Sequence, residues 1–150
     1  MFLGSNRSCQ LFDATVGKSI SPKLRGRDLF FHHLNRSESL VLVSRRLSTV
    51  YFWQKGFSDF ETVMLDGDFG GLGVNKDETI MALASDGGVV RFLDLISRKP
   101  VGKALIHQED VRGIVFHPLN DRYVFTLTSG AKLYGWDSRE QNVFMGPVQL

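Results

Sequence analysis

One short pattern of residues occurs four times along this chain of 150 residues. Each copy places apolar or aromatic residues directly before a polar residue, and that polar residue is acidic in three of the copies. The copies lie about 40 residues apart, a period that is typical of repeat architectures. The equivalent apolar positions are Phe12, Trp53, Leu93 and Trp136.

Two further landmarks keep the same register, so the repeat does not depend on a single pattern. Upstream of each of the last three copies, an apolar run ends in serine or threonine about eight residues before the aromatic position. A shorter apolar segment precedes each of these runs. The serine and threonine positions are Ser44, Ser85 and Thr128, and the shorter segments are 29–31, 72–74 and 114–116.

The apolar runs have the character of β-strands. They are short, rich in valine, isoleucine, phenylalanine and tyrosine, and bounded by turn residues, for example at 75–77, 86–88 and 129–130. No segment carries an apolar stripe at the helical period of 3.6 residues, so we predict no helices. Each repeat is expected to form four short antiparallel strands.

The last repeat resembles a WD40 repeat. His107 falls where that family carries the histidine of its Gly-His dipeptide, Thr128 falls on the second strand, and Trp136-Asp137 is the signature dipeptide. In the family the histidine, the serine or threonine and the tryptophan are joined by hydrogen bonds that stiffen the blade. The resemblance implies such a set here, without its fourth member, because the family's turn aspartate is replaced around Gly130.

The other repeats match the same family less completely. The repeat 66–105 keeps Ser85 and Asp86 but has leucine in place of the tryptophan. The repeat 25–65 keeps Ser44 and Trp53, with Arg45 at the position of the aspartate. The resemblance covers nearly the whole chain and identifies a superfamily, without singling out one of its members.

We therefore expect an all-β fold, an incomplete WD40-type β-propeller of four-stranded antiparallel blades. Residues 1–24 are predicted to form an outer half-blade, followed by blades at 25–65, 66–105 and 106–150. Closed propellers contain roughly 4–8 blades, and about three and a half are counted here. Our hypothesis is that the chain is the C-terminal part of a larger propeller or a truncated gene product.

The composition points to a soluble globular chain. The net charge of +2 is too small to indicate nucleic-acid binding by itself. Cys9 is the only cysteine, no signal peptide is recognised, and no apolar run approaches the roughly 20 residues that span a bilayer. We expect a cytoplasmic or nuclear protein without membrane insertion.

No group of residues predicts catalysis or a cofactor. The triplet 68–70 spells the magnesium motif of kinases, but the other kinase motifs are missing. His32 and His33 are adjacent on a predicted strand, so they point to opposite faces and do not chelate one metal ion. The glycine-rich loop that follows Asp66 lacks the final glutamate of a calcium loop. We expect no enzyme activity, no metal and no cofactor.

The expected function is a scaffold that binds other proteins through the loops entering the innermost strands. Phe69 is the most interesting candidate, because exposed aromatic residues anchor interfaces, although it could equally pack between blades. The candidate partner-binding residues are Asp68, Phe69, Gln108, Arg112 and Arg45, with Asp86 from a neighbouring turn.

Two alternatives stay open. A loose basic rim would suit a subunit of an RNA-processing or ribosome-assembly particle, and such contacts weaken steeply with salt. Ser48 follows two arginines, in the manner of a basophilic kinase substrate. The residues of the basic rim are Lys18, Lys23, Arg25, Arg27, Arg98, Lys99 and Lys103.

Overall fold

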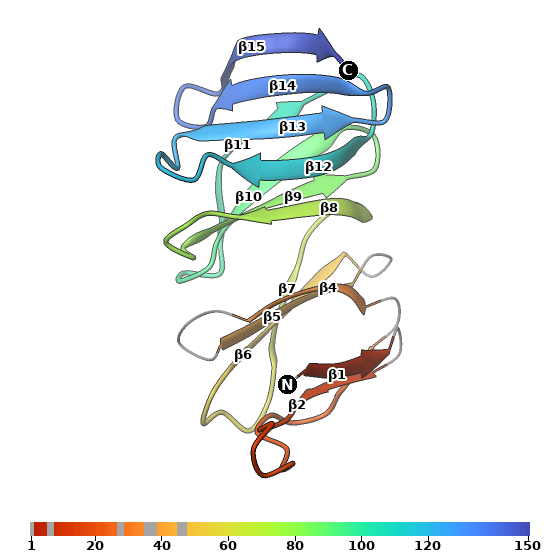
Figure 1. Ribbon diagram of the computed structural model, residues 1–150, viewed down its shortest axis with the longest axis vertical. Helices are drawn as coiled ribbons and strands as arrows, with labels where there is room; N and C mark the ends of the chain where they lie inside the picture. The colour runs from red at the N-terminus through yellow and green to blue at the C-terminus, as the bar shows by residue number, and fades with distance from the viewer. Residues whose placement is uncertain (1, 6–7, 27–28, 35–38, 45–47) are drawn as a thin grey trace. The chain divides into compact units, whose positions relative to one another are not determined.

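The computed structural model describes residues 2–5, 8–26, 29–34, 39–44 and 48–150, which contain fifteen β-strands and no helix (Figure 1). All four sheets are antiparallel, with neighbours in the sheet that are also neighbours along the chain. The prediction of an all-β chain is confirmed. The strands belong to two compact units, Met1–Asp68 and Phe69–Leu150, which are described separately.

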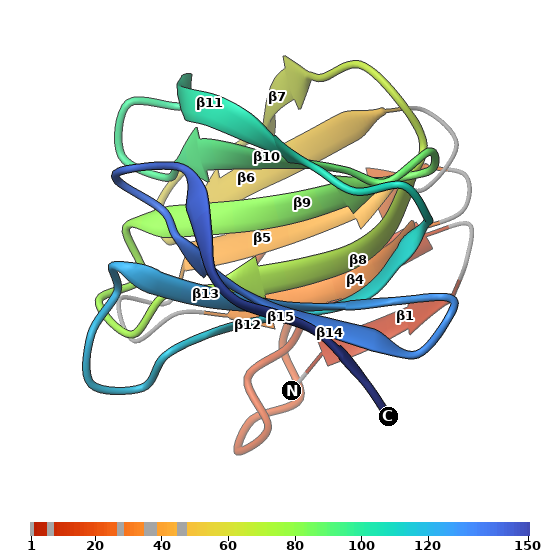
Figure 2. The ribbon, with the colours of Figure 1, turned by 90° about the horizontal axis from the view of Figure 1, so that it is seen from above.

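The unit 69–150 contains two four-stranded sheets, shown from above in Figure 2. Each follows the chain from its first to its last strand without a crossover. The strands of the first sheet are β8 (Phe69–Val74), β9 (Ile80–Ser85), β10 (Val89–Asp94) and β11 (Pro100–Ile106). Those of the second are β12 (Val111–Phe116), β13 (Tyr123–Thr128), β14 (Lys132–Asp137) and β15 (Asn142–Gln149).

The two sheets of this unit pack face to face around one apolar core. Phe92 and Phe116, from opposite sheets, meet edge to face with ring centroids 6.3 Å apart, a favourable aromatic geometry. The first strands of the two sheets, β8 and β12, are neighbours (Figure 1). Gly73 permits this approach, because a Cβ there would lie 3.0 Å from the carbonyl oxygen of Ile114. The buried core consists of Ala82, Ala84, Val90, Phe92, Leu105, Val111, Phe116, Val124 and Trp136.

The acidic residue of the repeated pattern closes the turn that follows its strand, which is β2 (Ser8–Leu11), β10 or β14. The carboxylates of Asp13, Asp94 and Asp137 each accept backbone N–H bonds, 2.6–3.1 Å long, from residues two or three positions further on. Such bonds are the usual reason for aspartate in turns. The N–H of Ser97 is the main cause that holds the pKa of Asp94 below its ordinary value of 3.8.

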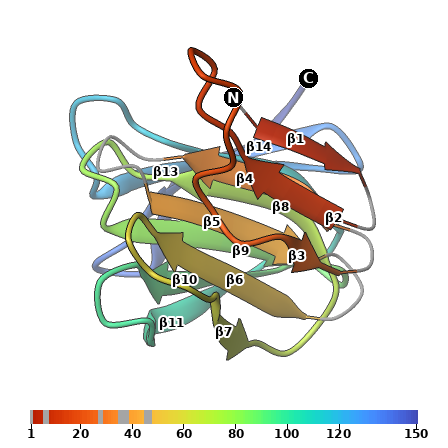
Figure 3. The ribbon, with the colours of Figure 1, turned by 90° about the horizontal axis from the view of Figure 1, so that it is seen from below.

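The unit 1–68 contains a three-stranded and a four-stranded sheet (Figure 3). Trp53 is buried with Leu11 and Leu24 of the smaller sheet, so the two sheets share a core. The smaller sheet consists of β1 (Phe2–Ser5), β2 (Ser8–Leu11) and β3 (Leu24–Arg25). The larger consists of β4 (Leu29–Leu34), β5 (Ser39–Ser44), β6 (Thr49–Gln54) and β7 (Glu61–Met64).

The smaller sheet is more complete than the outer pair of strands expected from residues 1–24. β1 pairs with β2 over four residues, from Phe2 with Leu11 to Ser5 with Ser8. The sequence did not reveal β1, because its four residues are too short to show a recurring landmark. Cys9 on β2 is buried, and burial raises the pKa of its thiol to about 11, so the thiolate form is suppressed.

Within the described residues there is no helix with the length and apolar character needed to cross a bilayer.

Candidate functional site

A chain of hydrogen bonds ties the loop before β12 to the second sheet of the 69–150 unit. The indole N–H of Trp136 donates to Thr126 Oγ1 over 2.9 Å, and that oxygen lies 2.7 Å from His107 Nε2. His107 Nδ1 lies 3.0 Å from the carbonyl oxygen of Gly88, which only accepts, so Nδ1 carries the proton. The Thr126 hydroxyl therefore donates to Nε2 of a neutral ring. Burial lowers the pKa of His107 below 6.5, although the bond to Gly88 acts in the opposite direction.

The hydroxyl in this set comes from Thr126, so the assignment of that role to Thr128 was wrong. Both threonines are buried and lie on the same face of β13. Thr126 lies two residues along β13 from Val124, which pairs with Trp136, whereas Thr128 lies at the end of the strand. Thr128 Oγ1 instead donates to Glu109 Oε2 over 2.8 Å. The spacing of eight residues therefore pointed to Thr128, which is two residues beyond Thr126 and on the same face of the strand.

The carboxylate of Glu109 reaches into the β13–β14 turn, where the family's aspartate is missing. Its carboxylate pairs with the ammonium group of Lys132 and accepts the backbone N–H of Gly130 as well as the Thr128 hydroxyl. The hydrogen bond from Lys132 is the main cause that holds the pKa of Glu109 below its ordinary value of 4.5. A Cβ at Gly130 would collide with this carboxylate. No motif indicates this pairing, because Glu109 comes from the loop before β12.

The sheet β8–β11 has no equivalent hydrogen-bonded set. Strand register places Leu83 and Leu93 where the second sheet has Thr126 and Trp136, and both leucines are buried. An apolar pair replaces the polar one, so this position has no indole or hydroxyl group to satisfy. Ser85 donates to the carbonyl oxygen of Val89 and thereby closes the β9–β10 turn.

In the 1–68 unit the second tryptophan has a different partner. The indole N–H of Trp53 donates to the carbonyl oxygen of Phe57, within the turn that follows β6. Ser44 is buried at the end of β5. Trp53 therefore secures a local turn, while its ring packs into the core of this unit.

Three of the expected partner-binding residues lie at one end of the 69–150 unit. We call Asp86, Gln108 and Arg112 the loop surface, and all three are exposed. Asp110 holds this end together, because its carboxylate accepts the N–H of Gly87 over 2.9 Å and lies 3.4 Å from Arg112. Loops attached to a rigid framework in this way are typical places for binding residues.

The remaining candidates do not extend this surface within the unit. Phe69 is 0% exposed, so the prediction that it is an exposed anchor for a partner was wrong, and the alternative that its ring is packed agrees with the structure. It begins β8, where it pairs with Ser85 of β9. Asp68 is exposed and closes the other unit. Arg45 lies outside the described residues.

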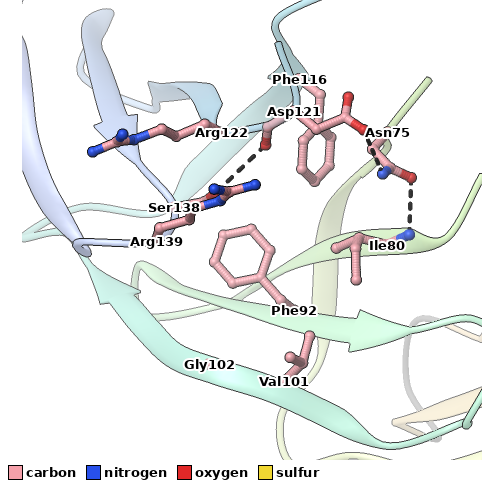
Figure 4. Close-up of a pocket in the computed structure, with 10 residues that line it drawn as sticks. All are labelled: Asn75, Ile80, Phe92, Val101, Gly102, Phe116, Asp121, Arg122, Ser138 and Arg139. Carbon is pink, nitrogen blue, oxygen red and sulfur yellow. Dashed lines mark hydrogen bonds between the residues drawn. The ribbon is translucent and has the colours of Figure 1, made fainter. Parts of the chain in front are cut away.

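A pocket that the sequence did not predict lies at the opposite end of the strands of the 69–150 unit. We call it the intersheet pocket, because both sheets line it, and its volume is about 330 Å³ (Figure 4). Its residues come from loops and strand ends that are distant in sequence, which explains why no motif marks it. The lining residues are Asn75, Ile80, Phe92, Val101, Gly102, Phe116, Asp121, Arg122, Ser138 and Arg139.

Comparison with known proteins identifies the fold of these sheets. No family model matches the sequence. The chain is 29% identical over 97 residues to the protein transport protein SEC31 of Kluyveromyces lactis. Its backbone is similar to that of Hsv2 from Kluyveromyces marxianus, with a TM-score of 0.74 and 12% identity. Both relatives are WD40 propeller proteins.

The chain has the fold of β-propeller blades. It covers only part of each relative: 62% of the chain aligns with 8% of SEC31, and 91% aligns with 43% of Hsv2. A second structure, the hydrazine synthase of Kuenenia stuttgartiensis, has a TM-score of 0.66 at 13% identity, with 77% of the chain aligned to 34% of that protein. At such identities the structural matches show the propeller fold alone.

Proposed function

We propose that these blades form a non-catalytic module that binds other proteins through the loop surface. The observation that carries this proposal is the exposure of Asp86, Gln108 and Arg112 on a framework fixed by buried hydrogen bonds. A rigid base lowers the entropy lost when loops engage a partner. Arginine is also enriched in protein interfaces. SEC31 is named as a protein transport protein, but the alignment covers too little of it to carry transport over to this chain.

We expect the loop surface to select partners by charge and shape. The test is affinity capture with the tagged chain from cells that express it, followed by mass spectrometry. Arg112→Glu and Gln108→Ala should each remove the same set of captured proteins, since both side chains lie on the exposed loops. Lys76→Glu is the matched control, because Lys76 is exposed in the β8–β9 turn, at the other end of the strands.

Three results would contradict the proposal: an unchanged set of proteins in both loop variants, an equal loss in the Lys76 control, or capture that disappears after nuclease treatment. The last result would favour the RNA alternative, for which Lys18, Lys23 and Arg25 are exposed in the 1–68 unit. RNA capture should then fall steeply as salt rises.

We further propose that the blades belong to a larger propeller, because nothing within the 69–150 unit covers one face of the sheet β12–β15. Val115, Phe125 and Phe144 lie on that face, and the Phe144 ring is 49% exposed. Strand register makes Phe125 equivalent to Ala82, which the next sheet covers in the 69–150 unit. By this internal precedent, the missing cover is a further four-stranded blade.

We expect the 150-residue chain on its own to self-associate through this face. Light scattering coupled to size-exclusion chromatography should give a mass above that of one chain, which is 16.9 kDa. Phe144→Glu should lower the mass, because a charge on the face opposes its burial. A monodisperse monomer that melts in one cooperative step would exclude the larger-propeller proposal.

A further inference from the structure

We propose that the intersheet pocket is a second binding site, which accepts an apolar side chain of a partner peptide together with a neighbouring carboxylate. It goes beyond the proposed function, because it lies at the opposite end of the strands from the loop surface and involves none of its residues. The walls of the pocket, its charge and its open mouth each favour such a ligand.

The walls of the pocket suit an apolar side chain. Phe92 and Phe116 come from the two sheets and line the pocket with their rings, and Ile80 adds an aliphatic side (Figure 4). Binding sites are typically concave and mostly apolar, with a few polar groups that fix orientation, and they range from about 300 to 1,000 Å³. At about 330 Å³ this pocket is at the small end of that range, which favours one large side chain over an extended ligand.

The polar groups of the pocket are satisfied with one exception. Asn75 Nδ2 donates to Asp121 Oδ2 over 2.9 Å, so these two side chains satisfy each other's hydrogen-bonding groups. Arg122 pairs with Asp137 at 2.5 Å and reaches Glu140 at 3.8 Å.

Arg139 is the exception. Its backbone N–H caps the turn, but within the described part of the chain its guanidinium group has no ion pair and no hydrogen bond. Figure 4 shows its side chain beside the two phenylalanine rings. A guanidinium binds a carboxylate through two parallel hydrogen bonds, and this geometry gives specificity as well as affinity. The free donors therefore point to an acidic group next to the apolar one.

The same facts argue against a phosphate group as the ligand. A phosphate carries about two negative charges and three acceptor oxygens, and it needs several donors. Arg122 is already paired with two carboxylates, so Arg139 has the one guanidinium group without an ion pair among the described lining residues. Asp121 adds a negative charge to the wall. One cation beside aromatic rings matches a carboxylate on an apolar peptide better.

The mouth of the pocket is accessible from solvent. Val101 lines it and is 42% exposed, so a partner side chain enters past this residue. Gly102, with φ +69°, lies next to it, and a Cβ there would be 3.0 Å from Gln141 Nε2. Glycine thus lets the two sheets approach at this point without a side chain between them.

The test uses an acetylated peptide with one phenylalanine between two glutamates. Its binding to the full chain is followed by NMR of the Ile80 and Val101 methyl groups, which line the pocket. We expect saturable shifts that are lost when alanine replaces the phenylalanine or lysines replace the glutamates. Arg139→Glu should weaken binding at least about tenfold, the scale of one charge-assisted contact. The peptide with two lysines should bind this variant better than it binds the original chain.

A second variant tests the pocket without changing its charge. Val101→Trp fills the mouth and should abolish binding, whereas Val148→Trp, at a position 44% exposed outside the pocket, should leave it unchanged. Far-ultraviolet circular dichroism checks that each variant is folded. The proposal is overturned if millimolar peptide causes no saturable shifts, or if the Arg139 and Val101 variants bind the peptide as tightly as the original chain does. It is also overturned if inorganic phosphate alone causes the same shifts.

Discussion

Replacing Phe69 by alanine is expected to destabilise the 69–150 unit by about 3–5 kcal/mol, the cost of a cavity left by a fully buried phenylalanine. Phe69 is 0% exposed at the start of β8, so the neighbouring side chains cannot collapse into the space without moving the strand. The measurement is urea unfolding followed by tryptophan fluorescence. Each unit contains one tryptophan, so a Trp53→Phe background leaves Trp136 as the reporter for this unit.

The matched control is Phe144→Ala, which removes the same ring from an exposed position of the same unit. We expect a loss of about 1 kcal/mol or less there, because about half of that residue is already exposed to water. The comparison separates a core role of Phe69 from a role in partner binding. A stable Phe69→Ala variant that had lost its partners would restore the interface interpretation.

Replacing Thr126 by valine is expected to cost about 2–4 kcal/mol, although the two side chains have nearly the same shape. The change leaves the indole N–H of Trp136 and Nε2 of His107 buried without partners, and each unsatisfied group costs about 1–3 kcal/mol. Urea unfolding in the same Trp53→Phe background measures the effect. The emission of Trp136 should also shift, because its N–H loses its acceptor.

Thr128→Val provides the control for this prediction. Thr128 is also buried on β13, but its hydroxyl donates to Glu109, whose carboxylate keeps its bonds to Lys132 and Gly130. We expect a loss of about 1 kcal/mol. If Thr128→Val were the more damaging of the two, the original assignment from spacing would be right and the geometry described here would be wrong.

The period, the strands and the all-β fold were predictable because they depend on local signals. Apolar alternation and turn residues act over a few positions, and four copies reinforce each other. Side-chain pairing was harder to predict. A spacing of eight residues placed the key hydroxyl at Thr128, whereas the strand register gives that role to Thr126. Register depends on the partner strand, which a count along one strand does not include.

The intersheet pocket shows the limit of sequence reasoning more clearly. Asn75 and Asp121 both carry turn signals, yet nothing in the sequence indicates that these two side chains bond to each other across the sheets. Arg139 follows the signature dipeptide as an ordinary surface residue. Its lack of a partner is a property of the folded surroundings. Phe69 illustrates the same point, since burial decided between its two roles.

The tryptophan and the aspartate of the signature dipeptide have separate structural roles in this chain, and each can therefore be replaced without the other. The aspartate closes a turn by bonds to residues at most three positions away, as Asp94 does beside a leucine. The tryptophan serves the core, as Trp53 does beside a glutamine. A repeat that has lost the aspartate can keep the packing of the tryptophan, and one that has lost the tryptophan can keep the turn closed by the aspartate. A motif search that demands both residues together finds one repeat in this chain, while the fold also accommodates the tryptophan without the aspartate and the aspartate without the tryptophan.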